Sequence, residues 1–204
     1  MADFNPPTST LFSFQALGSG TGLSISFDAS KGYSIVRTDT GVTGADLGAF
    51  QGKAVPAGGS WTAKMKFKPF TAGAANDRHR IGLAVYESAT GKIMWVGFNY
   101  SEGTRIISAI HTTSLNSFGT TDLAVSYVGR TPDYVAITWN GTSYLMKMSF
   151  DGGITYVTLA TVAATTAFTT AADKIGIYIN GFTNSAPFHF QPGALIDYYN
   201  DPDF

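Results

Sequence analysis

Cysteine is absent from this 204-residue chain, so disulfides and thiolate chemistry are excluded. Charged residues make up only 13% of the sequence, and the formal net charge is −1. A chain so close to neutral lacks the basic surface that binds nucleic acid or an anionic membrane. No apolar run approaches the roughly 18 residues of a membrane-spanning helix. We therefore expect no nucleic-acid partner and no membrane insertion.

Two other features are missing. The N-terminal sequence MADFNPPTSTLF has neither the basic nor the apolar region of a secretory signal peptide, so we expect synthesis in the cytoplasm. Sustained helical periodicity is lacking, and the Thr/Ala-rich stretch 158–174 is the one place where a short helix fits. Residues 1–10 contain Pro6 and Pro7 and are expected to form a flexible or docking arm.

The chain is rich in glycine, with 23 residues, and in aromatic side chains, at 14%. With 44% hydrophobic residues, this composition favours a packed, turn-rich β protein. A sandwich of this length fits in one domain, so residues 11–204 are predicted to form a single β-sandwich domain. We expect roughly ten to thirteen strands in two packed sheets. Residues 38–60 are expected to be loops with at most one short strand.

Residues 61–67 alternate between apolar and polar side chains, which predicts a strand with one buried and one exposed face. Pro69 is expected to end this strand, because proline cannot donate a ladder hydrogen bond. Further strands are predicted at residues 105–111 and 123–129. The exposed face of the first strand carries a row of lysines that would protect a sheet edge: Lys64, Lys66 and Lys68.

The clearest hairpin joins residues 80–87 to residues 92–100 through the turn Ser-Ala-Thr-Gly. Period-two alternation gives each of its strands two distinct faces. One face is wholly apolar and is expected in the core: Ile81, Leu83, Val85, Met94, Val96 and Phe98.

The opposite face of the hairpin combines small residues with aromatic and polar side chains. Small residues can form a shallow floor, an aromatic ring can stack on a sugar, and polar groups can bind its hydroxyls. This face could equally pack on a neighbouring subunit, where aromatic surfaces are also expected. The residues predicted to bind a glycan or a partner protein are Arg80, Tyr86, Trp95 and Asn99.

Residues 134–201 contain alternating segments separated by an Asn140-Gly141 turn and an Asp151-Gly152-Gly153 turn. The segment carries the patterns W-x-G-x-x-Y and S-x-D-G, then a K-I-G-I strand and an I-D-Y strand. This arrangement resembles the C-terminal half of concanavalin A-like lectin/glucanase domains, which include laminin-G-like jelly rolls. The resemblance implies an all-β, antiparallel two-sheet β-sandwich of jelly-roll type. The matching residues are Trp139, Gly141, Tyr144, Ser149, Asp151, Gly152, Lys174–Ile177 and Ile196–Tyr198.

In overall character the chain resembles virion proteins of tailed bacteriophages, because it is cysteine-free, weakly charged and rich in glycine and threonine. This resemblance implies a non-catalytic virion surface protein in a tail fibre, baseplate, receptor-binding tip or capsid decoration. Its expected partners are other virion proteins, a host surface glycan and further copies of itself, since multivalency strengthens weak contacts. Alternatives are a free-standing carbohydrate-binding lectin and, less favoured, a glycoside hydrolase.

Catalytic patterns are missing from the sequence. A glycoside hydrolase needs two carboxylates about 5–10 Å apart, yet neither Glu87 nor Glu102 has an acidic residue two positions away. His79, His111 and His189 lack zinc-binding spacing, and no G-x-S-x-G nucleophile elbow occurs. We therefore expect no catalytic residues and no metal ligands.

Calcium binding in lectin-like sandwiches uses clustered Asp and Asn oxygens. Such oxygens are dense only at Asn76-Asp77 and at residues 200–203. Neither stretch contains a specific calcium-binding motif, and a solvated loop and terminus explain both. Calcium is compatible with these stretches, but we predict no cofactor.

Overall fold

The computed structural model describes most of the expected sandwich. Some residues discussed above lie outside the described part of the chain: the predicted N-terminal arm, the segment 123–129, Asn76, Asp77, Glu102 and His189. The side chains of His79 and His111 also lie outside it. The described residues are 12–18, 23–28, 32–37, 46–70, 78–101, 104–116, 120–122, 132–182 and 193–200.

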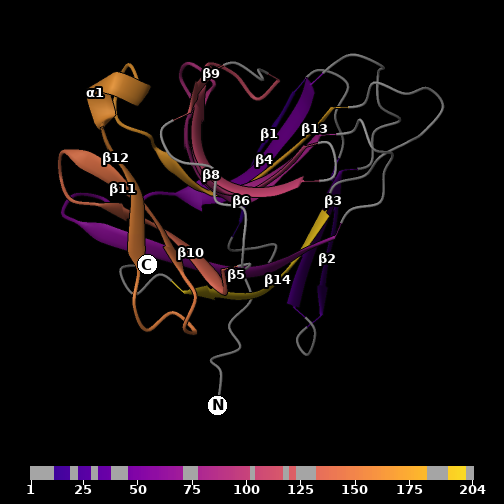
Figure 1. Ribbon diagram of the computed structural model, residues 1–204. Coiled ribbons are helices and arrows are strands. Elements are labelled where there is room, and N and C mark those ends of the chain that lie inside the picture. The colour runs from indigo at the N-terminus through magenta and orange to yellow at the C-terminus, as the bar shows by residue number, and fades with distance from the viewer. Residues whose placement is uncertain are drawn as a thin grey trace.

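Two seven-stranded antiparallel sheets pack face to face, which confirms the predicted all-β sandwich (Figure 1). Sheet I contains, in spatial order, β1 (Phe14–Leu17), β4 (Asp46–Ala54), β13 (Lys174–Phe182), β6 (Arg78–Glu87), β7 (Lys92–Ser101), β8 (Thr104–Thr112) and β9 (Thr120–Asp122). Sheet II contains β12 (Val157–Ala163), β11 (Ser143–Ser149), β10 (Tyr134–Trp139), β5 (Trp61–Phe70), β14 (Gly193–Asn200), β3 (Gly32–Arg37) and β2 (Leu23–Asp28).

The described part of the chain contains one helix, the four-residue α1 (Ala164–Ala167). It lies within the stretch where a short helix was expected, and the preceding residues of that stretch form β12 instead. No helix among the described residues is long and apolar enough to cross a membrane.

The first strands belong to both layers, since β1 and β4 join sheet I while β2 and β3 join sheet II. β4 has nine residues and lies between β1 and β13, so it is longer than the short strand expected for residues 38–60. Its glycines resemble a loop in sequence but serve close packing. A Cβ on Gly52 would lie 2.4 Å from the carbonyl oxygen of Ile175, where no side chain fits.

β5 also extends further than predicted, because it runs through Pro69 to Phe70. Its pairs with β10 end at Met65, whereas its pairs with β14 continue to Phe70. Pro69 therefore lies beyond the β10 pairs, and a proline is tolerated where one side of a strand needs no donor.

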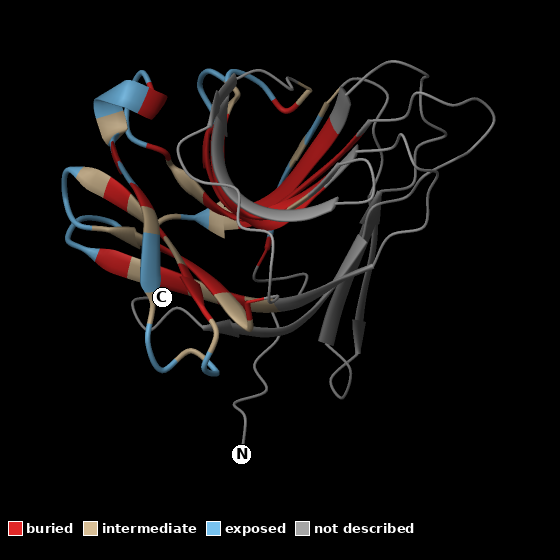
Figure 2. Ribbon diagram, in the orientation of Figure 1, coloured by how far each residue is buried: buried red, intermediate tan, exposed pale blue. Residues whose placement is uncertain are grey.

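The main hydrophobic core lies between the two sheets, and Figure 2 shows buried residues along strands of both. The predicted apolar face of the β6–β7 hairpin is confirmed as part of it. All six residues are at most 6% exposed: Ile81, Leu83, Val85, Met94, Val96 and Phe98. From sheet II, Trp61, Ala63 and Met65 reach the same core, which confirms the predicted inner face of β5.

Both predicted turns are present. In the turn between β10 and β11, Asn140 Oδ1 accepts hydrogen bonds from the backbone N–H groups of Thr142 (3.0 Å) and Ser143 (2.8 Å). Gly141 has φ 97°, a left-handed conformation that favours glycine. The asparagine thus closes the turn in the way expected of an Asx turn.

In the loop after β11, the Asp151 carboxylate accepts hydrogen bonds from Thr155 Oγ1 (2.6 Å) and Ser149 Oγ (2.7 Å). Hydrogen bonds from the Thr155 side chain and backbone lower the pKa of Asp151 to about 2. The S-x-D-G pattern therefore corresponds to a hydrogen-bonded structural loop.

Candidate functional site

The four residues predicted to bind a ligand share one face of the β6–β7 hairpin: Arg80, Tyr86, Trp95 and Asn99. This face is not an open surface. Trp95 is 0% exposed, Arg80 is 1% exposed and Tyr86 is 7% exposed, while Asn99 is partly exposed. The expectation of an open aromatic wall is therefore wrong. A binding role for these residues stays a prediction, and it would require the covering residues to move.

Part of the cover comes from residues 113–116, here called the strap, which follow β8. Its Leu115 is 7% exposed. The Leu115 carbonyl accepts hydrogen bonds from Tyr178 Oη (2.8 Å) and Asn180 Nδ2 (3.1 Å), both on β13. The strap therefore extends from the end of β8, past β7 and β6, to β13. It completes a second hydrophobic cluster with Phe50, Ala84, Tyr86, Ile93, Trp95 and Tyr178, against which Phe14 and Ala16 of β1 pack.

Two glycines provide the seat for the strap. A Cβ on Gly48 would lie 1.9 Å from the carbonyl oxygen of Leu115, and a Cβ on Gly18 would lie 1.7 Å from Asn116 Oδ1. Asn116 Oδ1 also accepts a hydrogen bond from the Gly48 N–H (3.0 Å). Close approach of the strap to the backbone thus depends on missing side chains. What remains next to Tyr86 is a small pocket of about 230 Å³.

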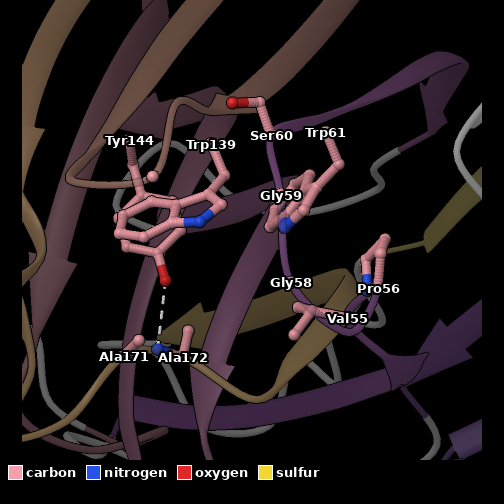
Figure 3. Close-up of a pocket in the computed structure, with 11 residues that line it drawn as sticks. Val55, Pro56, Gly58, Gly59, Ser60, Trp61, Trp139, Tyr144, Ala171 and Ala172 are labelled. Carbon is pink, nitrogen blue, oxygen red and sulfur yellow. Dashed lines mark hydrogen bonds between the residues drawn. The ribbon is translucent and has the colours of Figure 1, made fainter.

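A larger pocket, of about 460 Å³, opens at one end of the sandwich (Figure 3). It lies between the loop before β5, the turn between β10 and β11, and the segment before β13. We call it the end pocket. Its lining residues are Val55, Pro56, Gly58, Gly59, Ser60, Trp61, Trp139, Gly141, Tyr144, Ala171 and Ala172.

Three aromatic residues form the wall of the end pocket because strand register aligns them. Trp139, the last residue of β10, is the Cα partner of both Trp61 on β5 and Tyr144 on β11. The ring centroids of Trp139 and Tyr144 are 4.6 Å apart, and those of Trp61 and Tyr144 are 6.3 Å apart. Trp61 and Tyr144 are at most 3% exposed, whereas Trp139 is partly exposed. Trp139 is therefore the ring of this wall most open to a ligand.

Tyr144 ties the wall to the floor of the pocket. Its Oη accepts a hydrogen bond from the Ala172 N–H at 3.0 Å, drawn as a dashed line in Figure 3. Burial, together with the negative charges of Glu87 and Asp173, raises the pKa of Tyr144 to about 12. The hydroxyl is protonated at neutral pH, as a tyrosine ordinarily is, so it can donate one hydrogen bond as well as accept the one from Ala172.

The segment before β13 is positioned by Glu87, which is only 1% exposed. Its carboxylate accepts hydrogen bonds from the Thr169 N–H (3.2 Å) and from Thr170 Oγ1 (2.7 Å), and also from Thr90 Oγ1. Burial of the carboxyl raises its pKa, but these hydrogen bonds outweigh burial and lower the pKa of Glu87 to about 2. Glu87 is thus a charged structural anchor with its oxygens occupied.

Asp173 adds a second anchor between the same two segments. Its carboxylate accepts hydrogen bonds from the Ser88 N–H (2.8 Å) and Ser88 Oγ (2.7 Å), and it forms a salt bridge with Lys174. The Asp173 carbonyl also accepts a hydrogen bond from the Val55 N–H (3.1 Å). The two sides of the end pocket are therefore joined through the backbone.

The end pocket offers aromatic rings, backbone groups and hydroxyl groups to a ligand. Its lining residues include no charged side chain and no histidine. Gly58 and Gly59 have φ 75° and 68°, and a Cβ on either would meet nothing within 4 Å, so the rim is exposed backbone. A partly exposed aromatic ring beside uncharged polar groups suits a flat ligand with hydroxyl groups.

The W-x-G-x-x-Y pattern predicted the β-sandwich fold but did not predict this pocket. A signal was present, because the aromatic residues Trp61, Trp139 and Tyr144 all lie beside turn residues. Aromatic side chains at strand ends lie at the end of a sandwich, where loops can leave them partly open. Their alignment across three strands depends on register, which one sequence does not reveal.

No group of three or more His, Asp or Glu side chains capable of holding a metal ion occurs among the residues that the structure describes. Two stretches were compatible with calcium, residues 76–77 and 200–203. The side chains of both stretches lie outside the part of the chain that the structure describes. The side chains of Lys64 and Lys66 are partly exposed on β5, as expected for the outer face of a strand. The predicted protection of a sheet edge is wrong, because β5 lies inside sheet II, between β10 and β14. Lys64 Nζ lies 5.5 Å from the ring centre of Tyr156.

Comparison with known proteins gives matches in structure but not in sequence. No family model matches the chain, and no curated protein matches it. A functionally unknown protein from Saccharomyces cerevisiae is similar with a TM-score of 0.54 and 14% identity, over 90% of this chain and 96% of that one.

Two further solved structures have similar scores. The CBM2 module of the evolved Dit of Lactobacillus casei BL23 phage J-1 has a TM-score of 0.53 and 13% identity, over 97% of this chain and 94% of that module. The Bacteroides ovatus xyloglucan PUL protein GH43B has a TM-score of 0.53 and 16% identity, over 91% of this chain. The match spans only 37% of the GH43B chain.

At such low identity these likenesses concern the fold alone. Both named relatives contain β-sandwich domains, and the agreement covers nearly the whole chain. The resemblance to concanavalin A-like jelly rolls is therefore supported at the level of the fold.

Proposed function

We propose that this chain is a non-catalytic carbohydrate-binding β-sandwich on the surface of a tailed-phage virion, where it contributes to host attachment. The sugar-binding site is the end pocket. The observation that carries the proposal is the partly exposed ring of Trp139 in an uncharged pocket of about 460 Å³. Loops at the end of a rigid sandwich are suitable places for such recognition.

The geometry of the pocket supports a sugar ring as the ligand. The volume lies within the range of about 300–1,000 Å³ typical of small-molecule sites. The Trp139 ring offers an apolar face, and Ser60, the rim backbone and the protonated Tyr144 hydroxyl offer hydrogen-bonding groups. Because no lining side chain is charged, the pocket favours a neutral sugar over a uronic or sialic acid.

The absence of acids from the lining supports binding rather than cleavage at this pocket. Glycoside hydrolysis generally requires two carboxylates flanking the scissile bond. Glu87 and Asp173 lie behind the pocket wall, and their oxygens are engaged by Thr90, Ser88 and neighbouring groups. Neither is among the residues that line the pocket.

The virion part of the proposal is supported by the phage neighbour. By its name, the CBM2 module of the phage J-1 Dit is a carbohydrate-binding module in a phage protein. It matches this chain over nearly the full length of both, unlike GH43B, of which the chain spans 37%. A free-standing lectin with the same pocket is the alternative.

Binding can be tested with a panel of neutral and acidic oligosaccharides, using ligand-observed NMR and then calorimetry on each hit. We expect a neutral sugar to bind. Trp139→Ala should weaken its affinity at least about tenfold, which corresponds to about 1.4 kcal/mol, because the stacking face is lost.

Ile154→Ala is the matched control, since it also truncates an exposed apolar side chain, 82% exposed, but outside the pocket lining. It should leave the affinity unchanged. Failure of every neutral sugar to bind at millimolar concentration would overturn the proposed site, and so would equal affinities of wild type and Trp139→Ala. Release of reducing ends from any polysaccharide would overturn the non-catalytic part.

The virion location needs a separate measurement. Mass spectrometry of purified particles should detect the chain at a fixed copy number relative to the tail or capsid proteins. A chain that binds sugar but is absent from the particles would be a free-standing lectin.

A further inference from the structure

Strand β12 ends sheet II and has one edge free of any partner strand among the described residues, since it pairs only with β11. It has seven residues, more than the other three strands that end the two sheets, β1, β2 and β9. An unpaired strand edge presents a row of backbone N–H and C=O groups to which another strand can add.

This edge carries little of the protection that natural proteins usually place on edge strands. Charged residues and proline are the common protective devices, yet residues 152–172 contain none of either. Among the described residues, the exposed large apolar side chains are Leu17, Ile154 and Val157. Val157 is the first residue of β12, and Ile154 lies in the loop before it. Val157 is 55% exposed.

The sequence of β12 is nearly palindromic, which suits antiparallel pairing with itself. Its first six residues, from residue 157 to residue 162, read V-T-L-A-T-V. If two copies pair about a two-fold axis at the centre of this segment, Val157 lies opposite Val162 and Thr158 lies opposite Thr161. Cross-strand Thr–Thr pairs are favourable, as are contacts between β-branched side chains.

The faces of the sheet agree with this register. Val157 and Val162 are the Cα partners of Met148 and Tyr144, both buried on the inner face of β11. Directly paired residues point to the same side of a sheet. The two valines therefore lie on the inner side of sheet II, with Val162 5% exposed and Val157 55% exposed. The register places the exposed Val157 of each copy opposite Val162 of the other, on the same side of the joined sheet.

The threonines follow the same rule on the other face. Thr158 and Thr161 are the Cα partners of Lys147 and Leu145, on the outer face of β11, and both are exposed. The β-bulge leaves Leu159 without a Cα partner on β11. In the self-paired register Leu159 lies opposite Ala160, so a large residue meets a small one.

We infer that β12 is the dimerisation edge of this protein, and that it pairs antiparallel with β12 of a second copy about a two-fold axis. The partner is a second copy because the near-palindrome makes the edge complementary to itself, as a two-fold interface requires. The pairing joins two sheets II into one continuous sheet. The inference goes beyond the proposed function and does not depend on sugar binding.

The register can be tested by disulfide trapping, because the chain has no native cysteine. Residues directly opposite each other in an antiparallel pair have Cα atoms about 4.5–5.5 Å apart, within disulfide range. T158C/T161C should therefore give a covalent dimer under mild oxidation, with two bridges per dimer. Non-reducing electrophoresis and intact mass measure the product.

The single variants T158C and T161C are the matched controls. In the proposed register each new cysteine is about 10 Å from its own copy, three residues along the strand, which is too far for a disulfide. They should stay monomeric on the gel. Equal cross-linking by the single variants would overturn the register, and absence of a covalent dimer from T158C/T161C would overturn the interface.

A second pair of variants tests the contact without covalent chemistry, by sedimentation velocity over a range of concentrations. T158K/T161K places lysine opposite lysine across the axis, whereas T158K/T161E places lysine opposite glutamate. Both substitute the same exposed positions, so the folded monomer is affected similarly. We expect wild type and T158K/T161E to dimerise, with T158K/T161K at least tenfold weaker. A monomeric wild type, or equal association of the two variants, would contradict the inference.

Discussion

Sheet I and the end pocket each carry a cluster of aromatic side chains, but only one cluster is open. On the outer side of sheet I, Phe50, Trp95 and Tyr178 are fully buried, because Leu115 of the strap and residues of β1 pack in the same cluster. At the end of the sandwich, Trp139 remains partly exposed beside Trp61. Both clusters arise from cross-strand alignment, so strand pattern alone does not distinguish a core from a binding site.

The two clusters differ in exposure because the strap packs on the first, whereas the loop before β5 leaves open space beside the second. The strap lies against the backbone because Gly48 and Gly18 have no side chain, and it brings Leu115 to fill the space. The loop before β5 also has glycines, Gly58 and Gly59, but these form a rim with open space beyond them. Glycines thus allow the strap to pack closely on the sheet I cluster, whereas the glycines at the end pocket leave Trp139 accessible.

The largest expected contrast is between Trp95→Ala and Trp139→Ala. Removing the fully buried Trp95 side chain should lower the free energy of unfolding by about 3–5 kcal/mol, since it leaves a cavity. Trp139→Ala should cost about 1 kcal/mol, because the ring is already partly in solvent. Urea denaturation followed by far-UV circular dichroism measures both. Similar losses would show that the two clusters are equally part of the core.

The strap itself can be tested with Gly48→Ala. A Cβ at this position would lie 1.9 Å from the Leu115 carbonyl oxygen, so the strap must move and its hydrogen bonds from Tyr178 and Asn180 must weaken. We expect a loss of about 2–3 kcal/mol in the free energy of unfolding. Tryptophan fluorescence should also shift to the red as Trp95 becomes accessible.

Gly59→Ala is the control from the pocket rim. A Cβ there meets nothing within 4 Å, but its φ of 68° disfavours alanine, so the loss should be only about 1 kcal/mol. A cost for Gly48→Ala no greater than this would contradict the role of the strap.

A smaller effect than that of Gly48→Ala is expected at the carboxylate anchor behind the pocket. Glu87→Gln should lower the free energy of unfolding by about 2 kcal/mol at pH 7, because an amide cannot accept all the hydrogen bonds from Thr90, Thr169 and Thr170.

The pH dependence of stability gives an independent check on Glu87. Its folded-state pKa of about 2 lies below the value of about 4.3 for an unfolded glutamate. The stability that it contributes is therefore present above about pH 4.3 and is lost as the pH falls through about 2. Urea denaturation between pH 2 and 6 should show a shallower acid decline for Glu87→Gln than for wild type. Identical profiles would contradict the assignment.

Much of the fold could be predicted because the alternation of apolar and polar residues along a strand shows which of its faces is buried. The apolar face of the β6–β7 hairpin, the Asn140-Gly141 turn and the exposed lysines of β5 were all recognisable from alternation and turn residues. The full length of β4 was not recognisable. Its glycines serve close backbone packing against Ile175 and Leu115, which are distant in the sequence.

The candidate site could be predicted only in part. Shared placement of Arg80 and Trp95 on one face follows from period two, but Trp95 is buried in a cluster that includes Leu115 of the strap, which comes from another part of the chain. The aromatic wall of the end pocket likewise requires the register that aligns Trp139 with Trp61 and Tyr144.

By itself, the sequence determined the class of fold, the position of two turns and the sides of β5, β6 and β7 that face the core. These follow from local geometry, since side-chain direction alternates along a strand and glycine or asparagine permits tight turns. Only the tertiary structure decided which aromatic face is covered and which stays open. Burial is a property of contacts between distant segments, and whether the strap fits against Gly48 is settled when the two sheets have packed.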